Sequence, residues 1–389
     1  MLKQKWVLPA LAGLIVVMVV VICLLGRQGS GGGEADFFQE EPGEVEQTTA
    51  GNAEALLAKL STEQKVGQLF LILPDALAEE PDAAGTTTLS AKELKALETY
   101  PVGGFVLTGS NIQDKDQLDK LLGRLKKTSS VTPLFALQEE GGMGATIAGK
   151  EAFGLAKTET PAALGSTGDG AKVKDAAATI GKALADLGFQ MNLAPTCDVG
   201  SALSFSETPE QAAMCTSAAV EGFHEGGVAC VLKHYPGQGG TNASEGASLT
   251  ETWETMRTTS LYPFQAGMAA GADAIMVSHV TTPNASSDGL PASLSQEMIT
   301  SKLRGELRFS RLIMTAPLSD PAIARNYDSG DAALRAFQAG ADILLQPEDL
   351  LRRGLHVLRD GIAHGLDAHR RTAAHGHAAH HDLSAHRIP

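Results

Sequence analysis

The sequence is poor in cysteine and in positive charge. Its 389 residues include four cysteines, Cys23, Cys197, Cys215 and Cys230, with no CxxC pair and no Cys/His spacing typical of zinc ligands. We therefore expect neither a disulfide framework nor a metal site. Lys and Arg number 31 against 45 Asp and Glu, which gives a net charge of −14. Such an acidic chain repels phosphate backbones, so nucleic acid is excluded as the main partner.

The N-terminus carries the longest apolar run of the chain. Trp6–Leu25 contains no charged residue and follows Lys3 and Lys5. Its length of about 20 residues is enough for a helix to cross the ~30 Å hydrocarbon core of a bilayer. We expect residues 1–27 to form an uncleaved single-pass anchor in the cell membrane, with the body of the protein outside the cytoplasm. A long signal peptide is the alternative, although the end of the run lacks a small-x-small cleavage site.

The rest of the chain divides into three parts by composition. Residues 28–53 are rich in Gly and acidic residues, which predicts a flexible linker. Residues 54–350 have the pattern of a folded domain. Residues 351–389 hold eight of the eleven His, with no Lys and no Glu. Apolar spacing in this tail still permits a last helix, and His-x-His spacing permits a metal, but a disordered or frame-shifted end is favoured.

Short apolar runs alternate with amphipathic segments throughout residues 54–350. Strands are predicted at Val66–Ile72, Val102–Thr108, Pro133–Leu137, Gln190–Leu193, Val228–Leu232, Asp273–Val277, Leu312–Thr315 and Asp342–Leu345. Helices are predicted between them, among others at Asp116–Lys127, Ala171–Leu187, Pro209–His224, Tyr262–Ala270 and Ser295–Leu307. Eight strands alternating with helices predict a TIM-type (β/α)8 barrel behind the N-terminal anchor. A doubly wound open sheet is the rival, but no GxGxxG follows an early strand, and we expect no cofactor.

Polar residues follow the predicted strands at their carboxyl ends, where such barrels hold their working residues. These segments are Gln138–Gly142, Ala194–Asp198, Lys233–Thr241, Ser278–His279 and Thr315–Leu318. Because they converge on one rim, a binding site is favoured over a purely structural barrel. The glycines at 237, 239 and 240 indicate a loop rather than a phosphate cradle, since no GK[ST] follows them.

Several ordered motifs resemble glycoside hydrolase family three, in particular its single-barrel β-N-acetylhexosaminidases. The motifs are Val102–Leu107, Glu140–Gly142, Met191–Pro195 with Asp198, Lys233–Gly237, Pro263–Phe264, Ser278–His279 and Leu294–Ser295. Each is weak alone, but the set in this order, from about Leu60 to about Leu350, is specific. The resemblance implies a barrel that hydrolyses terminal N-acetylhexosamine linkages with retention, on N-acetylglucosamine-containing glycans of the cell wall.

The residues that the resemblance would make catalytic are not matched. The family places its nucleophilic Asp where this chain has Ala316, and its acid/base Asp-Ser-His set where this chain has Ser244, Glu245 and Gly246. Gln138, Met143 and Leu203 also replace residues that contact sugar in the family. Glu245 and Asp320 are conceivable substitutes, although a displacement of even ~1 Å can cost about 10²-fold in rate.

The residues that do match are those that hold the sugar or support the rim. The resemblance implies substrate contacts from Lys233, His234, Asn192, His279 and Glu140. Lys233 and His234 have a structural alternative as an ion-pair partner and a core histidine. Asp198 is expected to fix the loop that follows it by accepting backbone N–H bonds, rather than to touch the ligand.

Two functional classes remain open: an impaired hexosaminidase-type hydrolase, or a non-catalytic module that binds cell-wall glycan. The family match favours the first class. The missing carboxylate and imidazole favour the second.

Overall fold

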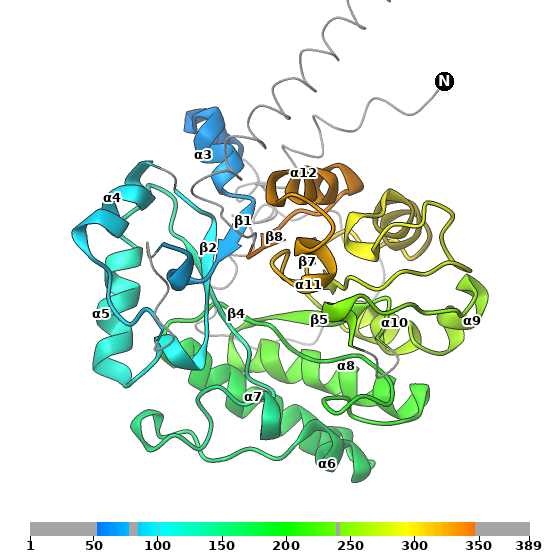
Figure 1. The fold of residues 1–389 in the computed structure, drawn as a ribbon. Coiled ribbons are helices and arrows are strands. Elements are labelled where there is room, and N and C mark those ends of the chain that lie inside the picture. The colour runs from blue at the N-terminus through cyan, green and yellow to red at the C-terminus, as the bar shows by residue number, and fades with distance from the viewer. Residues whose placement is uncertain (1–52, 78–84, 100, 239–241, 347–389) are drawn as a thin grey trace, which may run out of the picture.

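The computed structural model describes residues 53–77, 85–99, 101–238 and 242–346 (Figure 1). Its strands are β1 (Phe70–Ile72), β2 (Gly104–Leu107), β3 (Leu134–Leu137), β4 (Met191–Asn192), β5 (Ala229–Tyr235), β6 (Ala274–Val277), β7 (Leu312–Thr315) and β8 (Leu344–Leu345). All pair in parallel and in chain order, with β8 beside β1. Hydrogen bonds from Asp342 N to Ile313 O (2.7 Å) and from Thr315 N to Ile343 O (3.0 Å) join the last two strands. The predicted TIM-type barrel is confirmed.

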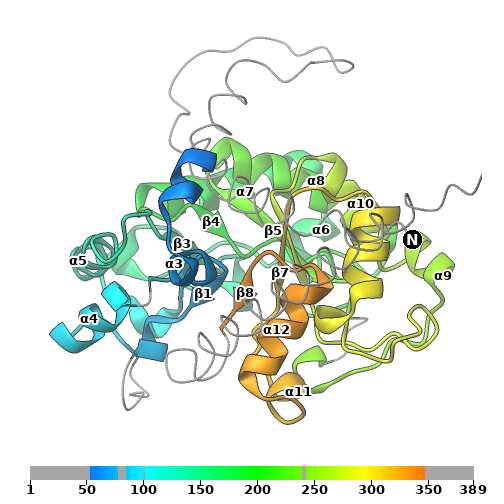
Figure 2. The ribbon, with the colours of Figure 1, turned by 90° about the horizontal axis from the view of Figure 1, so that it is seen from above.

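Helices surround the strands on the outside (Figures 1 and 2). They are α3 (Thr62–Gly67), α4 (Ala91–Thr99), α5 (Lys115–Leu125), α6 (Pro161–Ser166), α7 (Gly170–Asp186), α8 (Pro209–Gly226), α9 (Trp253–Thr258), α10 (Tyr262–Ala269), the π-helix η7 (Glu297–Glu306), α11 (Pro321–Ala324) and α12 (Ser329–Ala339). Short 3₁₀ turns are η1 (Pro74–Leu77), η2 (Gly109–Asn111), η3 (Gly142–Gly144), η4 (Glu151–Phe153), η5 (Ala243–Glu245) and η6 (Ala292–Leu294).

Local sequence signals explain where the principal helices begin and end. Asp114 and Asp169 accept hydrogen bonds from backbone N–H groups in the first turns of α5 and α7, which satisfies donors that have no partner inside the helix. Pro209 begins α8, at a position where a missing N–H costs nothing. Gly227 ends α8 with φ 88°, a left-handed conformation that suits glycine.

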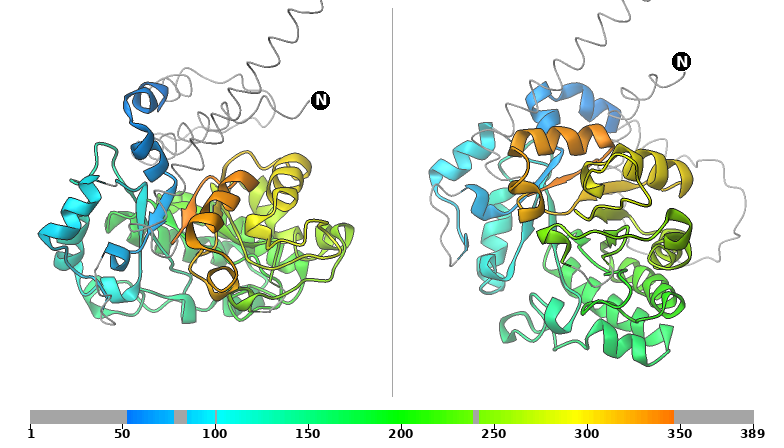
Figure 3. Two further views of the ribbon diagram at one scale, coloured as in Figure 1. Left: turned by 45° about the horizontal axis from the view of Figure 1, so that its top comes forward. Right: turned by 45° about the vertical axis from the view of Figure 1, so that its right-hand side comes forward.

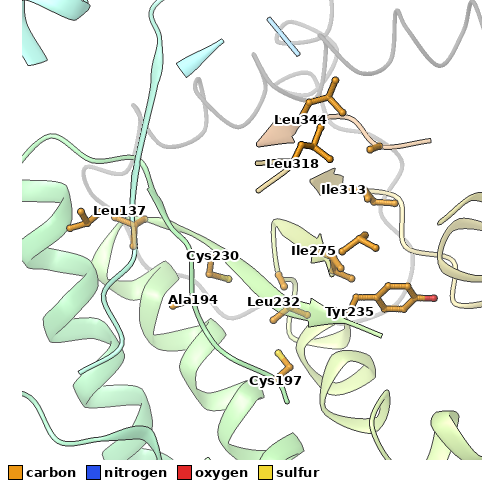
Figure 4. Packing of buried hydrophobic residues seen from close by; sticks show 14 of the residues in the cluster. Leu137, Ala194, Cys197, Cys230, Leu232, Tyr235, Ile275, Ile313, Leu318 and Leu344 are labelled. Carbon is orange, nitrogen blue, oxygen red and sulfur yellow. The ribbon is translucent and has the colours of Figure 1, made fainter. Parts of the chain in front are cut away.

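Two apolar cores lie on the two sides of the strands. Alternate residues such as Val106, Val231 and Met276 point into the barrel, where they form one buried cluster. Their neighbours along the strands, such as Leu137 and Leu232, belong to a second and larger cluster between the barrel and the helices (Figure 4). Because both faces of these strands are buried, their sequences are continuous apolar runs, as is typical of parallel barrels.

The structure corrects several predicted strand bounds. β5 continues to Tyr235, three residues beyond the predicted end at Leu232, and Asp273 precedes β6 instead of opening it. Val66 and Gly67 end α3 instead of beginning a strand, because Ser61 and Gln64 form a capping box that starts a helix at Thr62. Asp342 precedes β8 instead of opening it. Its carboxylate accepts a hydrogen bond from Ile313 N and pairs with Arg304.

The N-terminal and C-terminal predictions fall on residues outside the described ranges. These are the anchor at Trp6–Leu25, the linker at 28–53 except for its last residue, and the tail at 351–389. Among the helices of the described ranges, none is long and apolar enough to span a bilayer.

Two further views show how the helices enclose the barrel (Figure 3).

Candidate carbohydrate site at the carboxyl rim of the barrel

The polar segments predicted from the sequence meet at one end of the barrel. They lie at the carboxyl ends of β3, β4, β5, β6 and β7, which are all on the same side of a barrel. Lys233 and His234 are still within β5, and the segment that begins there is described as far as residue 238. A surface hollow lined by Thr87, Lys120 and Arg124 lies elsewhere, outside α5. The carboxyl rim is therefore the candidate functional site.

A buried ion pair joins β5 to the loop after β3. Lys233 Nζ lies 2.6 Å from Glu140 Oε1, and the two side chains are only 2% and 3% exposed. Lys233 also donates to the carbonyl of Leu193 (2.6 Å), while Glu140 Oε2 accepts from Thr196 N (2.8 Å). The loops after β3 and β4 are thus tied to β5 by charge-assisted hydrogen bonds. The structure gives Lys233 and Glu140 a positioning role, and direct contact with sugar remains a prediction for both.

Two glycines set the direction of this turn. Gly141 and Gly142 have φ 77° and 53°, and a Cβ on Gly141 would stand 2.2 Å from the carbonyl oxygen of Glu159. Only glycine fits there without strain. The turn buries Glu139 as well as Glu140. Glu139 Oε2 accepts hydrogen bonds from the backbone N–H groups of residues 146, 147 and 148.

The Asn192 side chain is hydrogen-bonded to the backbone. Its amide oxygen accepts from Glu139 N (3.0 Å) and its amide nitrogen donates to Glu139 O (2.9 Å). The side chain is completely buried. Both ends of the amide are therefore used to hold β4 against the end of β3, and a sugar contact from Asn192 remains untested.

His234 lies beside a buried carboxylate. Its Nδ1 is 2.9 Å from Asp198 Oδ2, and Asp198 Oδ1 accepts from the backbone N–H of Gln238 (2.9 Å). Asp198 is 3% exposed and His234 is 24% exposed. The carboxylate accepts a backbone N–H group, as expected for Asp198, but this group belongs to the loop after β5 and not to the loop that follows Asp198; the carboxylate also orients the imidazole. His234 is left with a ring edge that solvent or a ligand can reach.

His279, after β6, is fully enclosed. Its Nε2 lies 2.8 Å from the carbonyl oxygen of Pro317 and its Nδ1 lies 2.7 Å from Ser293 Oγ. A carbonyl can only accept, so Nε2 carries the proton and Nδ1 accepts from the Ser293 hydroxyl. Burial lowers the pKa of His279 to about 4. The ring is neutral at physiological pH and ties β6 to the loop after β7.

The loop after β7 shows what stands at the expected nucleophile position. Ala316 is buried and belongs to the apolar cluster inside the barrel. Asp320 immediately precedes α11 and is 24% exposed, with Oδ2 3.8 Å from His279 Nε2. Desolvation is the main reason why the pKa of Asp320 rises to about 6, with the charge of Glu245 adding to it and His234 opposing it. Asp320 is therefore half-protonated near pH 6.

The loop after β5 reaches over to the same region. Glu245, in η5, forms an exposed ion pair with Arg325 (2.7 Å), and η5 packs against α11. Ser244 Oγ donates to Asn242 Oδ1 (2.6 Å), and Gly246 ends the turn with φ 96°. None of these three residues supplies the imidazole of the expected acid/base set.

The structure thus brings His234, Asp320 and Glu245 close enough to influence one another electrostatically, with His279 behind them. It uses Lys233, Glu140 and Asn192 to brace the loops. Sequence reasoning did not single out Ser293 or Arg325 as partners of site residues. The motif at Leu294–Ser295 lay next to Ser293, but nothing in the sequence indicated that Arg325 would meet Glu245.

Comparison with known proteins agrees with this geometry. The family model described as glycosyl hydrolase family 3 N terminal domain matches residues 61–374, and so runs past the boundary expected near Leu350. Beta-hexosaminidase A of Pseudoalteromonas piscicida is 30% identical over 336 residues, which are 77% of this chain and 56% of that protein. The chain therefore spans little more than half of this relative.

Solved structures give the same picture. A glycoside hydrolase family 3 beta-N-acetylglucosaminidase from Paenibacillus sp. str. FPU-7 superposes with a TM-score of 0.70 at 31% identity, over 79% of this chain and 59% of that one. A beta-N-acetylhexosaminidase from Beutenbergia cavernae DSM 12333 gives a TM-score of 0.68 at 28% identity, over 82% and 98% of the two chains.

Proposed function

Because this chain belongs to glycosyl hydrolase family 3, we propose that its barrel binds N-acetylhexosamine-containing glycans of the cell wall at the carboxyl rim and cleaves them weakly or not at all. The observation that carries the proposal is the methyl group of Ala316 in the mouth of the barrel. The resemblance places the attacking carboxylate at this position. The braced rim around it supports binding without the main catalytic group.

Retaining hydrolysis needs two functions at defined places. One carboxylate attacks the anomeric carbon while a proton donor stands at the leaving oxygen, about 5–5.5 Å away when both are carboxyls. Ala316 supplies no nucleophile, and Ser244 and Gly246 supply no imidazole. A site that lacks both functions cannot carry out covalent catalysis, but it can still bind the sugar.

Among the residues predicted to contact sugar, His234 is the most accessible. The charged groups of Lys233 and Glu140 are paired with each other, and both ends of the Asn192 amide are hydrogen-bonded to the backbone of Glu139. His234 is oriented by Asp198 through Nδ1, which leaves Nε2 for a ligand hydroxyl. A hydrogen bond of this kind contributes about 0.5–1.5 kcal/mol, or up to about 3 kcal/mol when the imidazole is charged.

Calorimetry on the full-length chain tests the binding site. The ligand is a β-1,4-linked disaccharide of N-acetylglucosamine. His234→Ala is expected to weaken its affinity by roughly 10-fold, since each ~1.4 kcal/mol corresponds to a factor of ten. Lys182→Ala, an exposed change on α7, is the matched control and is expected to leave the affinity unchanged. Absence of binding by the parent protein, or equal affinity in His234→Ala, contradicts the proposal.

A second candidate function is weak hydrolysis with Asp320 as the proton donor. The specific observation in its favour is the pKa of Asp320, raised to about 6, together with its Oδ2 atom lying 3.8 Å from His279 Nε2. A carboxyl with such a pKa is suited to general acid catalysis near neutral pH. Glu245, whose charge acts on Asp320, is the carboxylate considered for the attacking role, but its side chain is paired with Arg325.

Activity on an aryl N-acetyl-β-glucosaminide separates the two candidates. Turnover by the parent protein that disappears in Asp320→Asn or in Glu245→Gln supports the second function. Asn326→Ala, two residues after the end of α11, serves as the control for local disturbance near Asp320. Equal background rates in all four proteins support binding alone.

A further inference from the structure

A cluster of three different donor side chains lies at the opposite end of the barrel from the rim. His224 is in the last turn of α8, Cys230 is the second residue of β5, and Asp273 immediately precedes β6. Cys230 points outward from β5 toward the helix layer (Figure 4). At ~3.3 Å per residue, four residues of β5 separate it from His234 by about 13 Å. The cluster is therefore independent of the carbohydrate site.

The donor atoms converge on one point. His224 Nε2 lies 2.7 Å from Asp273 Oδ2 and 3.9 Å from Cys230 Sγ, and all three atoms lie within 4.8 Å of one another. In the described parts of the chain this is the one group of three His, Cys, Asp or Glu side chains that comes so close together. Three donors, from α8, from β5 and from the residue before β6, are thus held close together.

These separations are close to those of a tetrahedral metal site. Zinc binds His nitrogen at about 2.0–2.1 Å, Cys sulfur at about 2.3 Å and carboxylate oxygen at about 2.0–2.2 Å. Tetrahedral angles then place nitrogen about 3.6 Å from sulfur and about 3.4 Å from oxygen. The sulfur is already within a few tenths of an ångström of its place. The contact between His224 Nε2 and Asp273 Oδ2 has to open from 2.7 Å by about 0.7 Å, which a small rotation of the imidazole achieves.

The surroundings also suit a metal. Arg311 holds the other oxygen of Asp273 (3.3 Å), and Cys230 N donates to Oδ2 (3.0 Å). These contacts fix the carboxylate, as outer contacts do in metal sites. His224 is 34% exposed and Asp273 is 16% exposed. A metal can therefore enter from solvent and keep a water as its fourth ligand.

We propose that His224, Cys230 and Asp273 form a Zn²⁺ site that fastens α8 to β5 and β6. The sulfur and imidazole donors favour zinc over magnesium or calcium. A thiolate and a carboxylate balance the charge of the ion, while the imidazole binds as a neutral ligand. This differs from the expectation of no metal drawn from the sequence. Cys230 and Asp273 are 43 positions apart, and only the pairing of β5 with β6 brings them together.

Cobalt spectroscopy on the full-length chain tests this site. The chelator-stripped protein is titrated with Co²⁺, which reports sulfur ligation by a thiolate-to-metal charge-transfer band in the near ultraviolet. We expect one equivalent to give this band and Zn²⁺ to abolish it. Residues 351–389 contain no cysteine, so any metal held by their histidines would not produce this band.

Variants assign the band to the cluster. Cys230→Ser is expected to abolish it, and His224→Gln, at a partly exposed position, is expected to weaken Co²⁺ affinity by about 100-fold or more, beyond the 10–100-fold effect of outer contacts. Cys197→Ser, another buried cysteine outside the cluster, is the matched control and is expected to keep the band. Absence of the band in the parent, its persistence in Cys230→Ser, or unchanged affinity in His224→Gln overturns the proposal.

Thermal unfolding gives a second readout that does not depend on the charge-transfer band. Saturating Zn²⁺ is expected to raise the Tm of the parent and of Cys197→Ser, because a ligand that binds the folded state stabilises it. The same addition is expected to leave the Tm of His224→Gln unchanged. An equal rise in His224→Gln assigns the metal to another place and contradicts the site.

Discussion

Breaking the buried pair between Lys233 and Glu140 is expected to destabilise the barrel strongly. The charged atoms are 2.6 Å apart and almost completely buried. At an effective dielectric constant of 20, their attraction is about 6 kcal/mol, which offsets a desolvation cost of several kcal/mol for each ion. Removal of one partner leaves the other charge buried without compensation. Each of Glu140→Gln and Lys233→Met should therefore lower the free energy of unfolding by about 3–5 kcal/mol.

The double variant distinguishes this account from simple loss of packing. With both charges gone, only the unmet amide of the new Gln and a lost hydrogen bond to Leu193 remain, at about 1–3 kcal/mol. The double-mutant cycle should then show a coupling of several kcal/mol between the two positions. Urea unfolding followed by circular dichroism measures each corner of the cycle.

An exposed pair provides the control for this cycle. Lys182 and Asp186 are 3.2 Å apart but 74% and 65% exposed, and removal of either should cost no more than about 1 kcal/mol. Strictly additive losses in the cycle at Lys233 and Glu140, or losses as small as those at Lys182, would refute the reasoning.

Three further predictions follow from the ionisable groups and from the N-terminal segment. His279, with a folded pKa of about 4 against 6.5 in the unfolded chain, disfavours its proton on folding. Stability should therefore fall as pH drops from 6.5 to about 4, by at most about 3 kcal/mol, and urea unfolding of His279→Gln should lack this slope. Asp320 shifts the other way, from 3.8 to about 6, so its contribution is present below pH 3.8 and is lost as pH rises through 6; a carboxyl NMR titration should find its midpoint near 6, and a midpoint near 4 would contradict the burial argument. Trp6–Leu25 should keep the chain in the membrane fraction after alkaline carbonate extraction, and recovery in the soluble wash would refute anchoring.

The barrel could be predicted from the sequence because its strands are buried on both faces. Such strands read as short apolar runs, and β7 was placed correctly at both ends. The predicted start of a strand was wrong where a helix-capping motif preceded apolar residues. Val66 is apolar enough for a strand, but the capping box at Ser61 makes it the end of a helix.

The site could be predicted only in part, because side-chain partners come from distant segments. The position of Lys233 at the rim followed from its place after an apolar run, but its pairing with Glu140 depends on the turn at Gly141. The raised pKa of Asp320 arises from burial and from a neighbour 75 positions away in the chain, Glu245. No local pattern carries such information.

Hydrolysis of an activated aryl N-acetyl-β-glucosaminide by the full-length protein tests the central claim most directly. Such a substrate has a leaving group that departs without protonation, so it reveals an enzyme that has lost only its acid. Because Ala316 provides no nucleophile, we expect binding of the sugar without turnover above background, and at most a trace of activity in Ala316→Asp. Robust cleavage by the parent protein would contradict the account.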